Sequence, residues 1–210
     1  MKRSFKHWTI TYFFDRLVEK AYRRRKPELP WLAPAANEFL SGYLKPTDTM
    51  LEFGSGRSTL WFCTKVAHIT SVEHDPVWFE KISNILKDRQ IKNVTYLLHP
   101  KQENSIPAAN TNYVNAARTI AKKSLDIVLV DGTYRSQCVL VSLPLLKPGG
   151  LLVIDNVNRY LPSNSHAPNS RSFSQGPIDD EWQEVLNEIG NWRFFWTSNG
   201  RSDTAFDFKP

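Results

Sequence analysis

Five short apolar runs, separated by segments with helical spacing, form the pattern of the middle of the chain. The runs are almost continuously apolar, as in LDIVLV, which is typical of strands that helices cover on both faces. This alternation predicts an α/β fold with a mostly parallel sheet and helices on both faces. The predicted strands lie at 49–53, 69–73, 94–98, 125–130 and 151–155. The predicted helices between them lie at 57–66, 76–88, 106–122 and 134–146.

The end of the chain departs from this alternation. A helix predicted at 179–189 is followed by two aromatic runs, WRFFWT (192–197) and TAFDFK (204–209). The runs flank an Asn-Gly pair, which favours the tight turn of a β-hairpin. We therefore expect the parallel sheet to finish in a C-terminal antiparallel hairpin.

The start of the chain has a pattern of its own. Aromatic and aliphatic residues recur at helical spacing over 5–25, and a shorter helix is predicted at 35–44. Between them PELPWLAP ends the first helix, because proline lacks an amide donor and restricts the residue before it. We accordingly divide the chain into an N-terminal helical arm, 1–45, and a main domain, 46–210.

Positive charge is concentrated in that arm. Residues 1–26 hold nine of the 27 lysines and arginines but two of the 21 acidic residues, so their net charge is +7 and the rest is about neutral. Nucleic-acid-binding domains carry positive charge along the working surface, so this distribution disfavours a nucleic-acid partner. Contact of residues 1–26 with an anionic membrane surface is an alternative, since each basic residue there contributes about 1 kcal/mol.

Cysteine usage and the length of the apolar runs bear on the compartment. Cys63 and Cys138 lie far apart in the sequence, which argues against a disulfide scaffold or a zinc site and suits a reducing compartment. No apolar run approaches the roughly 18 residues that a membrane-spanning helix needs. We expect a cytoplasmic protein.

The segment LEFGSGRST (51–59) follows the first predicted strand and opens a helix. This arrangement lets the backbone approach a ligand at a helix N-terminus. An ATP-binding P-loop would have glycine at Leu51 and lysine at Arg57, so neither position fits. A dinucleotide site would carry a third glycine where Thr59 stands. The turn by itself leaves its ligand open.

Polar residues in or just after several predicted strands narrow the choice of ligand. Ligands of open α/β sheets bind outside the carboxyl ends of the strands, so these side chains are expected at one site. Glu73 follows Gly54 by nineteen positions, where an acidic side chain can accept both hydroxyls of a ribose. The residues are Glu52, Glu73, Asp131, Asp155 and Asn156.

Four segments, LEFGSG, SVEHD, DIVLVDG and LLKPGGLLVIDN, together resemble the class I S-adenosylmethionine (SAM)-dependent methyltransferases over residues 46–208. The resemblance implies a Rossmann-like methyltransferase fold, SAM as cofactor and methyl transfer as the reaction. It also implies the cofactor-binding residues. These are Glu52, Gly54, Ser55 and Gly56 around the methionine part, Glu73 at the ribose with His74 beside it, Lys101 and Gln102 at the adenine, and Asp131 near the sulfonium.

The set Asp131, Asp155 and Asn156 further resembles the ligands of magnesium-dependent catechol and caffeoyl-CoA O-methyltransferases. In those families three such oxygens hold a divalent ion that binds the acceptor hydroxyl. Those enzymes carry a lysine shortly after the first aspartate, whereas this chain has Tyr134 and Arg135. Asp131, Tyr134 and Arg135 are therefore catalytic candidates. The alternative stays open that Asp155 and Asn156 only turn the loop after the strand.

The polar segment 156–178 follows the fifth strand and is longer than most loops of compact domains, which favours a functional role. We expect an acceptor-binding lid, with Arg159, Tyr160 and His166 as contacts. His166 is a further catalytic candidate as a base, against the alternative of a solvated loop histidine. The DNVNRY segment and GSGRSTLWF resemble a group of bacterial methyltransferase-like proteins associated with small-molecule or glycan modification.

The expected function is therefore SAM-dependent methylation of a small molecule or a sugar, on oxygen in preference to nitrogen. One alternative is a SAM-binding scaffold without catalysis. Another is a nucleic-acid methyltransferase, against which the chain lacks an N-P-P-Y-type motif for a flipped base. The acceptor and the oligomeric state stay open.

Overall fold

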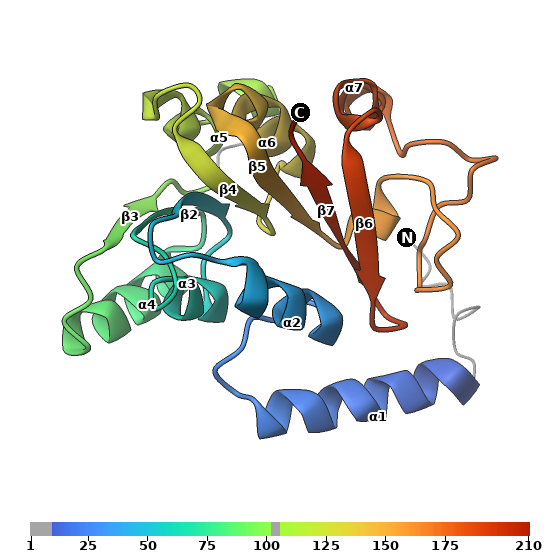
Figure 1. Ribbon diagram of the computed structural model, residues 1–210, viewed down its shortest axis with the longest axis horizontal. Coiled ribbons are helices and arrows are strands. Elements are labelled where there is room, and N and C mark those ends of the chain that lie inside the picture. The colour runs from blue at the N-terminus through green and yellow to red at the C-terminus, as the bar shows by residue number, and fades with distance from the viewer. Residues whose placement is uncertain (1–9, 102–105) are drawn as a thin grey trace.

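The fold is a seven-stranded sheet with helices on both faces (Figure 1). It is seen in a computed structural model that describes residues 10–101 and 106–210. The strand order is β3-β2-β1-β4-β5-β7-β6, and β7 is antiparallel to both of its neighbours. The predicted Rossmann-like fold with a C-terminal hairpin is confirmed. The strands are β1 (Thr49–Phe53), β2 (His68–Glu73), β3 (Val94–Leu98), β4 (Leu125–Val130), β5 (Leu146–Asp155), β6 (Arg193–Ser198) and β7 (Asp203–Phe208).

Strand β5 begins five residues earlier than the apolar run predicted, at Leu146 instead of Leu151. The Pro-Gly-Gly segment is held in the sheet edge because Gly149 N–H donates to Lys209 O and Lys209 N–H donates to Gly150 O. The pairing with β4 shifts register between Leu125 and Ile127, which accommodates this segment. Backbone pairing with the last strand thus extends β5 beyond its apolar part.

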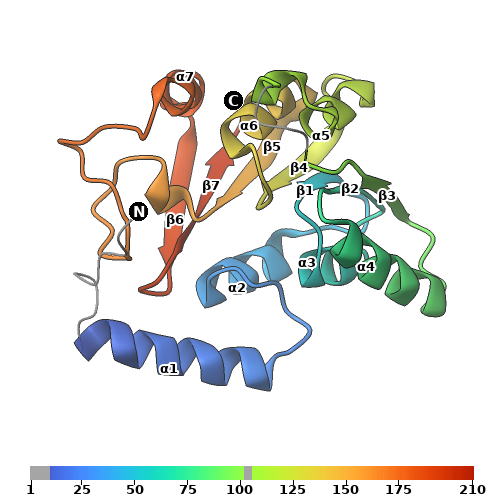
Figure 2. The same cartoon turned by 180° about the vertical axis from the view of Figure 1, so that it is seen from behind.

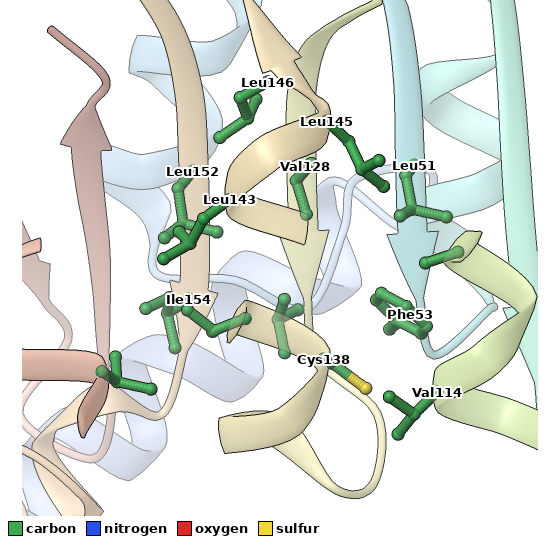
Figure 3. Close-up of a cluster of buried hydrophobic side chains, with 14 of the residues drawn as sticks. Leu51, Phe53, Val114, Val128, Cys138, Leu143, Leu145, Leu146, Leu152 and Ile154 are labelled. Carbon is green, nitrogen blue, oxygen red and sulfur yellow. The ribbon is translucent and has the colours of Figure 1, made fainter. Parts of the chain in front are cut away.

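Two buried clusters lie on opposite faces of the sheet. One packs under α5 (Asn112–Asn115), α6 (Arg135–Ser142) and α7 (Asp180–Ile189), and Figure 3 shows its centre. The other packs against α2 (Pro34–Tyr43) and α3 (Arg57–Phe62). Figure 2 shows α4 (Pro76–Asp88) on the same side as α3. Cys63 and Cys138 are buried free thiols within this packing.

The region predicted as one helix at 106–122 is three short turns instead. They are the 3-10 turns Ala108–Asn110 and Ala116–Thr119 and the single-turn α5 between them. Thr111 starts α5 by accepting a hydrogen bond from Val114 N–H on its side chain, which interrupts the preceding turn. The result places Tyr113, fully buried, against Phe53 at the end of β1.

Helix α1 (Ile10–Arg25) lies on the outside of the molecule, beyond α2 (Figure 1). It matches the predicted arm helix from residue 10, and residues 5–9 of that prediction lie outside the described part. Glu19 is buried on its inner side and pairs with Arg23 and with Arg201 of the β6–β7 turn. Within the described residues, no helix combines the length and apolarity needed to cross a bilayer.

The segment predicted as a lid is ordered by Asn158, which follows β5 in the short turn Val157–Arg159. This side chain is buried, donates to Ser170 Oγ at 2.9 Å and accepts from Asp203 N–H at 3.1 Å. Arg171 N–H donates back to Asn158 O at 2.9 Å. The loop is therefore tied to the start of β7.

Candidate functional site

A cavity of about 580 Å³ opens at the carboxyl ends of β1, β2 and β4. This is where open α/β sheets bind their ligands. Its lining joins residues of the glycine turn to residues of α4, α6, α7 and the loop after β5. They are Gly54, Ser55, Glu73, His74, Asp75, Trp78, Asp131, Gly132, Thr133, Tyr134, Arg135, Tyr160 and Trp182.

Two glycines let the ends of β1 and β4 meet at the cavity floor. Gly54 has a φ of +95°, and a Cβ there would lie 2.6 Å from Gly132 N. A Cβ on Gly132 would in turn collide with the Tyr113 hydroxyl. Glycine is needed at both positions for this close approach. The second glycine was not singled out from the sequence, although it follows Asp131 directly.

Glu73 is held in the cavity wall by the glycine turn and by the start of α4. Its Oε2 accepts from Ser55 N–H at 2.9 Å and from Ser55 Oγ at 2.6 Å. Its Oε1 accepts from the N–H groups of His74 and Asp75, each at 2.8 Å. Trp78 Nε1–H donates to Ser55 O at 2.8 Å and fixes the turn from the other side. The carboxylate is thus preorganised by backbone donors.

Glu52 points the other way, beneath the glycine turn, and does not line the cavity. It is fully buried, and its Oε2 accepts from Thr59 Oγ at 2.5 Å and from Ser71 Oγ at 2.6 Å. Thr59 Oγ also accepts from Gly56 N–H at 3.0 Å. Burial raises the pKa of Glu52 to about 7. Glu52 therefore supports the turn through Thr59 instead of facing a ligand.

Arg135 joins the ends of β4 and β5. Its guanidinium donates to Asp131 Oδ1 at 2.9 Å, to Asp131 O at 2.8 Å and to Gly132 O at 3.0 Å. It also donates to the backbone oxygen of Asp155. The side chain is 12% exposed, and Asp131 beside it is 32% exposed. The arginine brings a fixed positive charge into the cavity wall.

Asp131 and Asp155 lie close enough for their charges to interact, and Arg135 interacts with both. Burial, reinforced by the charge of Asp131, raises the pKa of Asp155 to about 8. Two neighbouring carboxylates cannot both ionise without a large electrostatic cost, so Asp155 is protonated near neutral pH. Asp155 is 4% exposed and lies outside the cavity lining.

The set Asp131, Asp155 and Asn156 does not fit a divalent ion. Asp155 Oδ1 accepts from Thr204 Oγ at 2.9 Å, and its Oδ2 accepts from Asn156 Nδ2 at 2.6 Å. The guanidinium of Arg135 binds Asp131 where a cation would need that carboxylate. No group of three or more His, Cys, Asp or Glu side chains suited to a metal occurs among the described residues.

Aromatic side chains from later parts of the chain form another wall of the cavity. Tyr160 stacks on Trp182 with ring centroids 4.6 Å apart and planes 7° apart. Arg135 lies 5.9 Å from the centroid of Tyr160. Tyr134 starts α6 in the left-handed region, with a φ of +50°, and also lines the cavity. The sequence analysis did not identify Trp78 and Trp182 as site residues. The signal that could have identified them is their position in the first turn of a predicted helix.

The remaining predicted residues lie elsewhere. Lys101 is exposed, with Nζ 5.8 Å from the centroid of Tyr134, and is not part of the lining. Gln102 falls outside the described residues. Arg159 is exposed, and His166 lies in the wall of a different cavity beside α7 and β6. The structure therefore brings together Gly54, Ser55, Glu73, His74, Asp131, Tyr134, Arg135 and Tyr160.

Comparisons with known proteins agree with this geometry. Residues 51–157 match the model of a family described as a methyltransferase domain. A search of curated proteins found no match.

Solved structures share the fold. A candidate caffeoyl-CoA O-methyltransferase from Staphylococcus aureus is 16% identical with a TM-score of 0.58, and the match covers 98% of this chain and 95% of that one. A methyltransferase-like protein from Silicibacter pomeroyi is 22% identical with a TM-score of 0.55, covering 84% and 86%. A candidate methyltransferase from Streptococcus mutans, in complex with SAH, is 14% identical with a TM-score of 0.54, covering 84% and 96%.

Proposed function

Because the chain belongs to the SAM-dependent methyltransferase family, we propose that it methylates an oxygen of a small molecule or sugar bound against Tyr160 and Trp182. One observation carries the proposal. A single cavity joins the Ser55–Glu73 wall, suited to a ribose and a methionine chain, to an aromatic wall that carries Arg135. Family membership favours an enzyme over a scaffold without catalysis.

Each wall has a role that its chemistry suits. We assign to Glu73 the acceptance of hydrogen bonds from the ribose hydroxyls, and to Asp131 the attraction of the sulfonium. SAM supplies the methyl group on that sulfonium. The stacked rings of Tyr160 and Trp182 offer a flat surface for an aryl ring or a sugar face. The protein contributes by aligning the acceptor oxygen with the methyl group and by excluding water.

Transfer to a hydroxyl also releases a proton. Asp131 is a carboxyl group in the cavity lining, and burial raises its pKa. We assign it the acceptance of the hydroxyl proton, with Arg135 stabilising the charge that develops on the acceptor oxygen. No step passes through a metal ion.

The test separates cofactor binding from transfer. Calorimetry should give SAM binding without NAD or ATP binding, and mass spectrometry should detect methylated products from a panel of phenols, sugars and glycans. Glu73→Gln should weaken SAM binding about tenfold or more, since a ribose loses a charged acceptor. Tyr160→Ala should keep SAM affinity and lose transfer. Absence of SAM binding by the wild-type protein would reject the proposal.

We further propose that the enzyme is cytoplasmic and that α1 places it on an anionic membrane surface. The helix turns Glu19 inward and exposes four large apolar residues together with basic ones such as Arg16 and Lys20, a mixture that suits a membrane interface. The basic run at the end of the helix, 23–26, is suited to anionic headgroups. The exposed apolar residues are Phe13 at 57%, Phe14 at 60%, Leu17 at 48% and Val18 at 65%.

Vesicle sedimentation tests this placement. The protein should sediment with phosphatidylserine-containing vesicles at low salt and less with neutral vesicles. The double variant Phe14→Ser, Val18→Ser should lose this binding. Val77→Ser, which removes a similarly exposed apolar side chain from α4, should keep it. Equal sedimentation of both variants would exclude α1 as the contact.

A further inference from the structure

A second cavity, of about 850 Å³, lies between α7, the β6–β7 hairpin and the loop at 161–167. Figure 1 shows these three elements side by side at the end of the sheet that carries β6. None of its lining residues belongs to the cavity that binds SAM. The two cavities adjoin along the chain, since Tyr160 lines the first and Leu161 the second.

The walls of this second cavity are apolar. On β6, Phe194 and Trp196 face it, while Phe195 between them packs on the other side of the sheet against Phe206. Phe194 is 61% exposed, which is unusual for a large apolar side chain in a strand. The other apolar lining residues are Leu161, Pro162, Ala167, Phe173, Leu186, Ile189 and Gly190.

Two buried aspartates of β7 contribute to the same cavity. Asp203 and Asp207 lie on one face of the strand, four residues apart, and are 2% and 4% exposed. Asp203 Oδ1 and Asp207 Oδ2 have no hydrogen-bond partner among the described residues. Burial raises the pKa of Asp207 to about 7. Burying a carboxylate without a hydrogen-bond or ionic partner costs free energy of folding, so the presence of these residues in the cavity calls for an explanation.

The charge around these carboxylates is one-sided. Among the lining residues, the only other side chain that can carry charge near neutral pH is His166, on the loop, and it is exposed. No lysine or arginine of the described residues, 10–101 and 106–210, lines the cavity. Within the described part of the chain, the cavity thus offers mainly apolar walls with open acceptor oxygens and no cation.

We propose that this cavity binds a compound with an apolar body and a protonated amine. The ammonium group pairs with Asp207, and the body packs against Trp196, Phe194 and Leu186. A fatty acid is excluded by charge repulsion, and a neutral apolar ligand leaves the carboxylates without a partner. The volume is in the range of sites for small organic ligands. This site is separate from the methyl-transfer site and does not depend on its acceptor.

Three probes with one apolar body test the proposal: 4-phenylbutylamine, 4-phenylbutanol and 4-phenylbutyrate. Calorimetry at about pH 8, where Asp207 is ionised, should show the amine binding about tenfold or more tighter than the alcohol, and no binding of the acid. Equal affinities for the amine and the alcohol, or no binding of any probe, would overturn it.

Variants locate the site and its charge. Asp207→Asn should remove the preference for the amine, and Asp203→Asn, about 13 Å away along the strand, should change it less. Glu188→Gln, an exposed carboxylate of α7 outside the lining, should leave it unchanged. Leu186→Trp should block all binding by filling the cavity. Near-ultraviolet circular dichroism checks that each variant is folded, and a preference that survives in folded Asp207→Asn contradicts the proposal.

Saturation with SAM separates this site from the acidic residues of the first cavity. Binding of the amine should be unchanged when SAM is bound. Loss of amine binding on addition of SAM would place the amine in the first cavity and overturn the inference, while leaving the proposed methyl transfer intact.

Discussion

The buried carboxyl group of Asp207 should make the folded protein less stable as the pH rises, and Asp207→Asn should remove that dependence. Burial raises the pKa of Asp207 from 3.8 to about 7. The folded state therefore binds the proton more tightly than the unfolded state does. The associated stability is present below the unfolded pKa and is lost as the pH rises through the folded value.

The magnitude follows from the shift. A change of about three pKa units, at about 1.4 kcal/mol each, corresponds to about 4 kcal/mol in the free energy of unfolding. About 3 kcal/mol of this falls between about pH 5 and about pH 9. The acids Glu52 and Asp155 titrate in the same range, but they are present in both proteins and cancel in the difference.

Urea denaturation followed by far-ultraviolet circular dichroism measures the difference. The stability of Asp207→Asn relative to wild type should increase steadily with pH across that interval. Glu188→Gln, an exposed carboxylate, should give a constant difference. If the Asp207→Asn difference also stays constant within about 0.5 kcal/mol, the carboxyl is not desolvated in the folded protein and the argument fails.

Three further changes probe the methyl-transfer site. Gly132→Ala should lower the free energy of unfolding by about 1–3 kcal/mol and weaken SAM binding, because the added methyl group has no space. Thermal unfolding and calorimetry measure the two effects. Gly42→Ala serves as the control, because a methyl group added there in α2 meets open space. Thr59→Val removes the hydroxyl that links the glycine turn to the strand, and should cost about 1–3 kcal/mol in urea denaturation while weakening SAM binding. Arg135→Met should lower kcat/KM about a hundredfold, with SAM affinity retained, by removing a charge at the reacting oxygen. Chelators should not change the wild-type rate, and an activity lost with chelator and restored by magnesium would contradict the role given to Arg135.

The sequence by itself determined most of the elements, 106–122 excepted, and the edge of the sheet where the candidate site lies. Buried strands are read from continuous apolar runs because both faces of a parallel sheet are covered, and β1, β3 and β4 begin and end where those runs do. The glycine turn and Glu73 were also local signals. Both depend on backbone conformation and on spacing from a strand end, which the chain carries without its distant contacts.

The direction of each side chain was decided only by the tertiary structure. Glu52 alternates onto the face under α3, so it supports the turn instead of lining the cavity. Arg135 reaches across two strand ends and takes the position that the motif suggested for a metal ion.

Contacts between segments that are far apart in the sequence also depend on the tertiary structure. Tyr160 stacks on Trp182, and Asp207 lines a cavity together with α7 and the loop at 161–167, because the sheet brings strands and helices from different parts of the chain to one edge. Whether a carboxylate finds a partner depends on those neighbours. Local spacing therefore predicted where charge would gather, while packing of the folded chain determined which charges are paired, which are protonated and which remain open to a ligand.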